Sequence, residues 1–578
     1  MRPISQRAIH PHWVIAWGAA AQSANVTAPP LRRATWATSN FAMIGAQPTF
    51  SPSQRFVLVG DCCFDRSLLL KHIKDYVEKA ESLSDLAIVG QIWEQWGTQT
   101  LNLLTGSFAL AVWDQEQQTL CLGRDPVGAK TLYYVLNKTS AAGWAAPRLR
   151  SLNSYHAQDL DPIALRDYLS CAFVPGAQTL WQGVRELRPG TSLGFPDGQP
   201  QRYWQPQEHI SHADRSMNWH AQQVRVLLEQ LVQQALPVGE PVGAYLSGGI
   251  DSSCVTAIAS RLHDHPVHTF SMHFGAQYPS ELEFANLVAA HCGTQHHVLE
   301  VSPQQIWQLL PETLAALDDP VGEGLTVPNL LLARSAKQIV GVALNGEGGD
   351  PCFAGPKNKP MLLNSLYGSI QDGSIQGTAD PASAYLTSFQ KCFVDLPRLL
   401  KPELWEVVKE VPSVFAAGLQ QQDTTFLNRL MLLNIEFKGA DYILTKVNNL
   451  TAAAGLEGRS PLFDPRMVAL SLQIPPAYKL SGAQEKAVLK AAVADLLPDV
   501  IVNRPKSGMV MSMQQWFLTH WRQQARSLLL NPRAAIAPYL NQTLIRDWLN
   551  YRGEVFPRYG LKLWLLVTLE IWLQENRR

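Results

Sequence analysis

The sequence predicts an α/β protein with two domains, the second of which is a doubly wound parallel sheet with added helices. The chain has 578 residues, enough for two to four domains. Residues 1–207 are rich in β-type runs, whereas residues 217–578 begin with apolar runs that alternate with helical patterns. Such alternation is typical of a parallel sheet that binds its ligand at the carboxyl ends of its strands. The polar stretch 208–216 is the expected linker.

The N-terminal domain is expected to contain short strands and two helices. The runs 106–114 and 119–125 are separated by polar residues, which is a hairpin signal. Gly97 is expected to end the second helix, because glycine is favoured just after a helix. The expected elements, besides these two hairpin strands, are strands at 13–21, 56–61 and 131–134 and helices at 67–82 and 85–96.

The C-terminal domain is expected to alternate helix and strand up to residue 345 and to be mostly helical after residue 380. The turn 237–240 leads from a long amphipathic helix into the first buried strand. The expected order is helix 219–236, strand 241–246, helix 252–262, strand 267–274, helix 283–291, strand 295–301, a helix ending at 335–338, and strand 339–345.

The composition excludes several classes of protein. Lys plus Arg and Asp plus Glu are both 48, and this balance argues against a nucleic-acid binder, which usually carries a basic excess. The eight cysteines form no CxxC pair, so we expect buried thiols in a reducing compartment rather than a zinc site or a disulfide framework. No apolar run is long enough to cross a membrane, and two tryptophans and a glycine make 13–21 a poor signal core. We expect a cytoplasmic protein.

The strongest local signal is the turn Ser247-Gly248-Gly249-Ile250-Asp251-Ser252-Ser253 between a strand and a helix. Glycines let the backbone approach a ligand, and the helix start favours an anion. The three serines add hydroxyl donors, and Asp251 can hold a metal ion. This predicts a phosphate cradle that lacks the Gly-Lys-[Ser/Thr] ending of a Walker loop. An ordinary glycine-rich turn with a serine cap is the alternative.

This turn resembles the pyrophosphate loop of the ATP pyrophosphatase superfamily, which includes asparagine synthetases, β-lactam synthetases and lasso-peptide cyclases. Its members cleave ATP between the α and β phosphates and form an adenylated intermediate. The resemblance implies ATP as a cofactor, with adenine held at the strand 267–274. The residues it assigns to ATP or pyrophosphate are Leu246, Ser247, Gly248, Gly249, Asp251, Ser252, Ser253, Ser271, Met272 and Gly346.

A second loop, Asn345-Gly346-Glu347-Gly348-Gly349-Asp350, follows another apolar strand and resembles an acidic element of asparagine synthetases. Two strand-end loops of one parallel sheet are expected to face the same crevice. Mg²⁺ prefers oxygen ligands from one or two carboxylates together with phosphates, so Asp251 and Asp350 are the expected metal ligands. Glu347 is the candidate that orients the nucleophile or takes its proton.

Two further stretches resemble asparagine synthetases. In 446–464, Asn448-Asn449 replaces the family's Asp-Arg, which is expected to remove charges near the acceptor site, and the nearby Glu457 and Arg459 are expected to be structural. In 504–508, Lys506 matches the family lysine that reaches the phosphates, and a cation there would stabilise the charge of the leaving pyrophosphate. Lys486 is expected to be a helix-surface or supporting charge.

The N-terminal domain resembles the αββα (Ntn-type) glutaminase domain of asparagine synthetases, through stretches such as Arg124-Asp125-Pro126-Val127-Gly128-Ala129-Lys130. That domain uses an N-terminal cysteine as nucleophile, but here Arg2 follows Met1 and no cysteine precedes Cys62. Val59-Gly60-Asp61 stands where the family has Asn-Gly-Glu. We expect an inactive domain; recruitment of Cys62 or Cys63 as a nucleophile is the competing hypothesis.

The resemblance implies an AMP-forming ligase that adenylates a carboxylate and joins it to an amine. The amine is expected to be ammonia or an amine of the same substrate, and ring formation, as in β-lactam synthetases and lasso-peptide cyclases, is favoured over ammonia-dependent asparagine synthesis. A non-catalytic ATP-binding regulator and a tRNA thiolase are the other hypotheses. The candidate partners are a small-molecule or peptide carboxylate, a precursor peptide with its processing enzyme, and a second copy of the chain.

Overall fold

The chain forms two units, which we describe from a computed structural model. The first comprises Met1–Asp161 and Gly176–Gln205, and the second comprises Pro162–Pro175 and Pro206–Arg578. The structure describes residues 13–21, 34–73, 77, 80–137, 142–211, 213, 215–355, 358, 361–362, 380–482, 484–505, 511–553 and 558–577.

The first unit contains two six-stranded sheets whose neighbouring strands run antiparallel. The strand orders are β10-β8-β9-β1-β3-β2 and β12-β11-β7-β6-β5-β4. The strands are β1 (Val14–Trp17), β2 (Trp36–Ala37), β3 (Phe41–Ile44), β4 (Thr49–Phe50), β5 (Phe56–Phe64), β6 (Gly106–Asp114), β7 (Thr119–Arg124), β8 (Tyr133–Asn137), β9 (Ala142–Ala146), β10 (Val184–Glu186), β11 (Thr191–Phe195) and β12 (Pro200–Arg202). The helices are α2 (Arg66–Lys71), α3 (Asp85–Trp96) and α4 (Thr100–Leu103).

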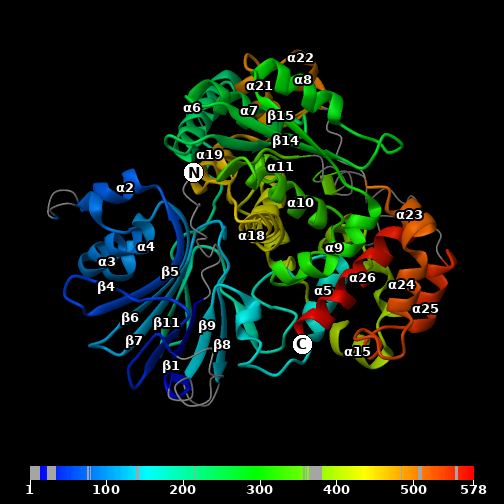
Figure 1. Cartoon of the computed structure of the whole chain (residues 1–578), viewed down its shortest axis with the longest axis horizontal. Helices are drawn as coiled ribbons and strands as arrows, with labels where there is room; N and C mark the ends of the chain where they lie inside the picture. The colour runs from blue at the N-terminus through cyan, green and yellow to red at the C-terminus, as the bar shows by residue number, and fades with distance from the viewer. Residues whose placement is uncertain are drawn as a thin grey trace. The chain divides into compact units, whose positions relative to one another are not determined.

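Alternating side chains of β5 and β6 separate two layers of core. Val57 and Val59 belong to the core between the sheets, whereas Leu58 belongs to the core under helix α3. The rings of Phe41 and Trp113 stack at 4.9 Å across the inner core. Figure 1 shows α2, α3 and α4 beside the sheet that contains β5. Because successive strand residues face opposite sides, β5, β6 and β7 contribute side chains to both cores. The predicted fold class of this domain is confirmed.

The second unit is organised around a five-stranded sheet of order β15-β14-β13-β16-β17, in which every neighbouring pair is parallel. Tyr245 pairs with Phe270, and Ala244 pairs with Leu344, so the strands β13, β14 and β16 end at one edge. This confirms the predicted doubly wound sheet. The strands are β13 (Val242–Tyr245), β14 (Val267–His273), β15 (Gln295–Glu300), β16 (Val342–Leu344) and β17 (Glu457–Arg459).

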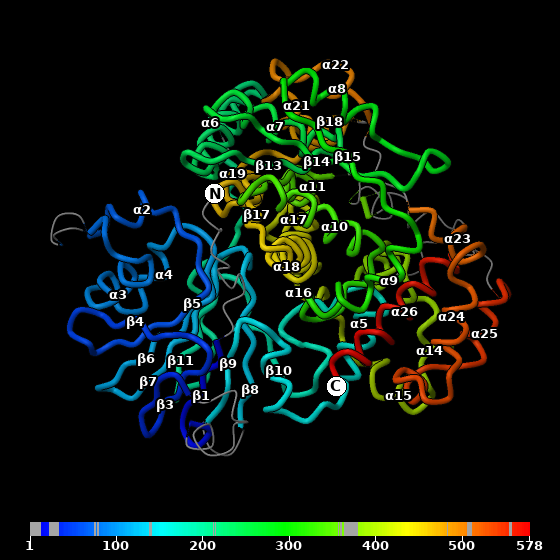
Figure 2. Tube along the Cα trace, in the orientation of Figure 1, coloured from blue at the N-terminus to red at the C-terminus, as the bar shows by residue number. Residues whose placement is uncertain are grey.

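Helices cover both faces of this sheet (Figure 1). Helices α6, α7 and α8 lie on one face, and α10 and α18 lie on the other, as the trace in Figure 2 also shows. The helices that flank the sheet are α6 (Met217–Ala235), α7 (Ile250–Leu262), α8 (Leu282–Cys292), α9 (Pro303–Ala316), α10 (Thr326–Lys337), α18 (Thr445–Ala453) and α21 (Ala487–Val493), and the π-helical segment η7 (Asn434–Leu444) leads directly into α18.

Helices α9, α23, α24 and α25 pack around α26 (Tyr559–Asn576), which is apolar on nearly all sides and is therefore buried along its length. The rings of Trp521 and Trp564 stack at 4.9 Å in this core. The other helices of four or more residues in the described part of the second unit are α5 (Pro162–Cys171), α11 (Gly349–Cys352), α13 (Pro381–Ser388), α14 (Leu396–Leu399), α15 (Pro402–Val408), α16 (Ala416–Leu419), α17 (Phe426–Leu433), α19 (Pro465–Gln473), α20 (Pro476–Lys479), α22 (Asp499–Asn503), α23 (Met513–Trp516), α24 (Arg522–Leu529) and α25 (Gln542–Leu549).

Several elements differ from the sequence expectation. The expected helix 67–82 is described as α2 up to Lys71 and as a 3-10 turn at Ala80–Ser82. For two other elements the reason for the difference is clear. Strand β16 is shorter than the expected 339–345, because the amides of Ile339 and Val340 bond back to the Ala336 carbonyl at the end of α10. Helix α7 begins at Ile250 rather than at Ser252, because Gly249 caps it. Within the described ranges, no helix is long and apolar enough to cross a membrane.

Candidate active site

The glycine-rich loop that follows β13 is held by its own serines. The Ser252 hydroxyl accepts from the Ser247 amide at 3.1 Å and lies 3.0 Å from the Ser247 hydroxyl. Gly248 has φ of +73°, and a Cβ there would lie 2.6 Å from the Ala285 amide nitrogen. Only glycine suits that backbone and that space. The loop therefore keeps its turn tight against helix α8.

The second loop, after β16, lies against the first. A Cβ on Gly346 would lie 2.5 Å from the Ser252 amide nitrogen, so the two backbones can approach only because residue 346 is glycine. The Glu347 amide donates to Asn345 Oδ1 at 3.0 Å, which fixes the turn that carries the Glu347 carboxylate. The two loops predicted from separate motifs thus meet at one edge of the sheet.

Lys486 joins the acidic residues of the two loops. Its ammonium lies 2.5 Å from Asp251 Oδ2 and also forms an ion pair with Asp350. Its side chain is 1% exposed, so the expected helix-surface position was wrong, whereas the supporting role agrees with this pair. Lys486 has φ of +57° just before α21, and that backbone turn directs its side chain inward. The sequence singled out Lys486 but did not predict that its side chain faces Asp251 and Asp350.

Asp251 and Asp350 fit a magnesium ion by their chemistry. Two carboxylates on adjoining loops are a donor set that Mg²⁺ takes together with substrate phosphates. Both carboxylates also line the same pocket. Among the described residues, no group of three or more His, Cys, Asp or Glu could hold a metal without such a substrate. The assignment of these two residues to Mg²⁺ stays a prediction.

Arg504 braces the glycine-rich loop from outside the pocket. Its guanidinium donates to the Gly248 carbonyl at 3.2 Å and forms an ion pair with Glu281. It also lies 3.9 Å from the centroid of the Phe284 ring. One planar cation therefore ties the loop to the start of helix α8.

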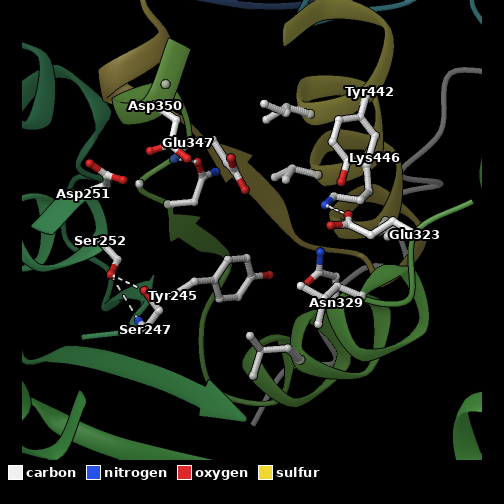
Figure 3. Close-up of a pocket in the computed structure, with 18 of the residues that line it drawn as sticks. Tyr245, Ser247, Asp251, Ser252, Glu323, Asn329, Glu347, Asp350, Tyr442 and Lys446 are labelled. Carbon is white, nitrogen blue, oxygen red and sulfur yellow. Dashed lines mark hydrogen bonds and ion pairs between the residues drawn. The ribbon is translucent and has the colours of Figure 1, made fainter. Parts of the chain in front are cut away.

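The pocket between the two loops and helices α10 and α18 has a volume of about 520 Å³. Figure 3 shows that its labelled polar residues form two groups, with Glu347 and Tyr245 between them. We call the group Ser247, Asp251, Ser252 and Asp350 the loop end, and the group Glu323, Asn329, Tyr442 and Lys446 the helix end.

Most of the predicted site residues line this pocket. They are Leu246, Ser247, Asp251, Ser252, Ser271, Met272, Gly346, Glu347 and Asp350. The pocket wall, as far as it is described, does not include Gly248, Gly249 or Ser253, and Ser253 is fully buried in α7. Lys506 lies outside the described residues.

The helix end is built on a carboxylate held by a buried cation. Lys446 Nζ lies 2.7 Å from Glu323 Oε2, and it also lies 4.8 Å from the centroid of the Tyr442 ring. Burial works to lower the pKa of Lys446, but the carboxylates of Glu323 and Glu347 raise it overall, so the amine stays charged. Burial and the hydrogen bond to Glu323 raise the pKa of Tyr442 well above its ordinary value. Its hydroxyl therefore stays a donor.

Two polar groups in the pocket have no hydrogen-bond partner within the described part of the chain. They are the hydroxyl of Tyr245 and the side-chain NH₂ of Asn345, and both are buried. Figure 3 shows the Tyr245 ring directed from the sheet toward the helix end. Buried polar groups are nearly always hydrogen-bonded, so these two are suited to partners on a ligand.

Sequence reasoning missed most of the helix end. Lys446 lay inside a recognised stretch, but Glu323, Asn329 and Tyr442 carried no motif. The side chain of Asn449 donates to Asp318 at 2.9 Å and does not line the described pocket, and the expectation that Asn448-Asn449 removes charges near the acceptor stays a prediction. The structural role expected for Glu457 and Arg459 fits their mutual ion pair at 2.8 Å.

The first unit offers no activated thiol at Cys62. Burial, followed by the neighbouring Asp61 carboxylate, raises the pKa of Cys62 to about 12, so it is a neutral thiol at pH 7. Asp61 is paired instead with Lys130 at 2.9 Å. Val59 is buried between the sheets, and its side chain has no amide group that could bind a ligand. None of the eight cysteines, all within the described ranges, forms a disulfide.

Comparisons with known proteins agree with both units. The family model described as asparagine synthase matches residues 223–574, and that described as glutamine amidotransferase domain matches residues 30–204. The chain is 24% identical over 543 residues to asparagine synthetase (glutamine-hydrolyzing) 1 of Bacillus subtilis, covering 87% of this chain and 84% of that protein.

Two further relatives are similar over comparable lengths. The chain is 28% identical over 461 residues to a putative asparagine synthetase (glutamine-hydrolyzing) of Mycobacterium tuberculosis, covering 73% of this chain and 70% of that protein. It is also 28% identical over 501 residues to amidase chyE of Penicillium rubens, covering 75% of this chain and 73% of that protein. Because the asparagine synthase model matches more than half of the chain, the protein belongs to the asparagine synthase family and is an ATP-dependent, AMP-forming ligase of C–N bonds.

Proposed function

We propose that this ligase adenylates a substrate carboxylate with ATP and Mg²⁺ and then joins it to an amine that does not come from glutamine. The observation that carries the proposal is the meeting of two acidic loops at one pocket, where Lys486 pairs with both Asp251 and Asp350. A site of this kind gathers charges of both signs where a triphosphate and a metal ion would lie.

The loop end supports the first step. A substrate carboxylate oxygen attacks the α-phosphorus, the bond to the β-phosphate oxygen breaks, and pyrophosphate leaves. Backbone amides of the glycine-rich loop and the hydroxyls of Ser247 and Ser252 would hold the phosphates. Bound Mg²⁺ would neutralise the phosphate charge, held by Asp251 and Asp350. Lys506, which lies outside the described residues, is proposed as a further cation for the leaving pyrophosphate.

Glu347 is the proposed acid–base residue of the second step. An amine nitrogen attacks the acyl carbon, the bond to the AMP oxygen breaks, and the nitrogen loses a proton. The Glu347 carboxylate lies between the loop end and the helix end (Figure 3), which is where the acyl group and the amine would meet. A carboxylate at that point can accept the proton.

The first unit favours an amine from a source other than glutamine. Val59 stands where relatives of the glutaminase type place an asparagine, and it is buried in apolar surroundings. Cys62 is held as a neutral thiol next to an acid, which disfavours it as a nucleophile. We therefore propose that the amine is free ammonia or belongs to the carboxylate substrate.

An amine on the same substrate would close a ring, as β-lactam synthetases and lasso-peptide cyclases do. The residues after Asp350, Pro351-Cys352-Phe353, depart from asparagine synthetases beside the acceptor side of the pocket. We favour the ring-forming reaction on this ground, with a precursor peptide and its processing enzyme as the partners it would require.

The test is pyrophosphate release from ATP and Mg²⁺ with three mixtures: aspartate plus ammonia, aspartate plus glutamine, and a panel of carboxylates that carry their own amine. We expect release with the amine-bearing panel and none that depends on glutamine. Release with aspartate plus ammonia, and asparagine as product, would identify the ammonia-dependent synthetase instead. Glutamine-dependent release would overturn the proposed inactivity of the first unit.

A further inference from the structure

We infer that Ala172 and Phe173 are positioning residues for the reaction, because they support both sides of the helix end of the pocket. They belong to Pro162–Pro175, a stretch of the second unit that lies in the sequence between the two parts of the first unit. The inference rests on the proposed function, since it gives these residues a part in holding the groups that the substrate meets. This part does not depend on glutaminase chemistry.

Helix α5, which precedes the two residues, is fixed within the second unit by bonds to backbone groups. The Arg166 guanidinium donates to the carbonyls of Val408, at 3.0 Å, and Val411, at 2.5 Å. The Leu169 carbonyl accepts from the Cys392 amide at 3.0 Å. Because these contacts hold α5 along its length, its C-terminal end is a firm support for the segments that touch it.

Ala172, just after α5, supports the loop that carries Glu323. Its φ of +70° lies in the left-handed region, which residues other than glycine rarely adopt, and its carbonyl accepts from the Gly322 amide at 2.8 Å. Gly322 is closely surrounded, since a Cβ there would lie 2.3 Å from Leu565 Cδ1 and 2.8 Å from the Tyr168 hydroxyl. Glu323 follows directly, so the backbone that carries its carboxylate is set by this contact.

Phe173 supports the opposite side of the helix end. Its ring stacks on the Tyr442 ring, with centroids 5.6 Å apart and planes inclined by 23°. The Tyr442 hydroxyl in turn hydrogen-bonds to Glu323, and its ring lies beside the Lys446 ammonium. A shift of the Phe173 ring would therefore displace the hydroxyl that contacts the carboxylate.

One dipeptide thus contacts two elements that are more than a hundred positions apart, the loop before α10 and the segment η7. Neither Ala172 nor Phe173 belongs to the described pocket wall, so both act through their neighbours. In an active site, a displacement of about 1 Å can cost about 10²-fold in rate. Loss of this support should weaken substrate binding at the helix end and leave the loop end unchanged.

The first test compares two equal changes in one aromatic cluster. Phe173→Leu removes the ring that stacks on Tyr442, and Phe389→Leu is the matched control. The described ring contacts of Phe389 are with Phe173, Tyr385 and Phe415, and it does not line the described pocket.

Steady-state kinetics use the carboxylate that supports pyrophosphate release in the wild-type protein. We expect Phe173→Leu to raise KM for this carboxylate about fivefold to twentyfold and to keep KM for ATP within about twofold. Phe389→Leu should keep both values within about twofold, while thermal melts show a similar loss of stability in the two variants.

A second pair of variants tests the backbone contact without any substrate. Ala172→Gly keeps the carbonyl and suits a positive φ, whereas the β-branched side chain in Ala172→Val opposes that backbone. Hydrogen exchange followed by mass spectrometry reports the protection of the Gly322 amide. We expect peptides over 318–325 to exchange about tenfold faster in Ala172→Val than in Ala172→Gly, and peptides over 246–253 to exchange equally.

The outcomes separate this inference from the proposed function. An unchanged KM in Phe173→Leu, equal changes in the two KM values, or the same change in Phe389→Leu would overturn it, as would equal exchange over 318–325 in the two Ala172 variants. If the wild-type protein releases no pyrophosphate with any carboxylate, the proposed function fails, and hydrogen exchange alone decides the inference. If Ala172→Val does not fold, Phe173→Leu and its control decide it.

Discussion

Both ends of the pocket contain a buried lysine that is paired with carboxylates, but the two ends are assembled from different parts of the sequence. At the loop end, Lys486 is 1% exposed and pairs with Asp251 and Asp350; at the helix end, Lys446 is 7% exposed and pairs with Glu323. In each pair a buried lysine faces more exposed carboxylates. Removing one partner of such a pair costs more than the pair contributes, because a charge is left with poor solvation. Each pair therefore holds its acid in one place.

The two ends differ in how far apart their residues lie in the sequence. The loop end comes from two short loops, each next to a strand, and its shape follows from glycines and serines within them. The helix end joins a residue before α10 with residues of η7 and α18, more than a hundred positions later. A variant at one end should therefore affect one half of the reaction. The predictions below test this separation.

The largest effect is expected for Asp251→Asn. The variant keeps the shape of the side chain but loses the charge that pairs with Lys486 and that would hold Mg²⁺. Pyrophosphate release should fall by about 10³-fold, the size seen when one preorganised electrostatic contact is lost. KM for the amine-bearing substrate should change less than twofold. The control is Asp264→Asn, beyond the end of α7, and activity near wild type in Asp251→Asn would contradict the assignment of the loop end.

The next effect is expected for Lys446→Met. The Glu323 carboxylate would then keep its charge without its partner, which should weaken the orientation of the acid and lower stability. We expect KM for the amine-bearing substrate to rise about tenfold to a hundredfold, about 1.4 to 3 kcal/mol, and KM for ATP to change little. An equal rise in both values would show that the two ends are not separable.

Arg504→Lys should act on the loop end alone. Lysine keeps the charge but loses the planar contacts to the Gly248 carbonyl and the Phe284 ring. KM for ATP should rise about tenfold, with KM for the amine-bearing substrate unchanged. Steady-state kinetics in ATP at saturating substrate measures this, and an unchanged KM for ATP would mean that the loop keeps its turn without the brace.

The smallest effect is expected for Tyr442→Phe. The ring beside Lys446 stays, and one hydrogen bond from the hydroxyl to Glu323 is lost. A hydrogen bond to a charged group contributes about 1.5 to 3 kcal/mol at most, and Lys446 remains to hold the carboxylate. We expect a threefold to tenfold rise in KM for the amine substrate. A much larger loss of kcat at constant KM would instead point to a role in the chemical step.

The fold was predictable where signals were local. Helix α3 occupies its predicted range, 85–96, because Ser84 caps its start and Gly97 follows its end. The parallel sheet was predicted from apolar runs between helices, which is a pattern of neighbouring residues. The extent of β16 was not predictable, because the backbone hydrogen bonds that end α10 use the amides of residues 339–340. Which of the two elements takes these residues depends on the three-dimensional position of α10, which the pattern of apolar residues does not show.

The site was predictable on the same terms. The sequence alone determined the two glycine-rich loops, their acids and the parallel sheet that brings them to one edge, because turns, caps and strand periodicity act over a few residues. Only the tertiary structure decided that Lys486 turns inward onto Asp251 and Asp350, and that Glu323, Tyr442, Lys446 and Tyr245 share one wall. Those contacts join segments far apart in the chain, and their partners are set by how helices pack on the sheet rather than by the residues beside them.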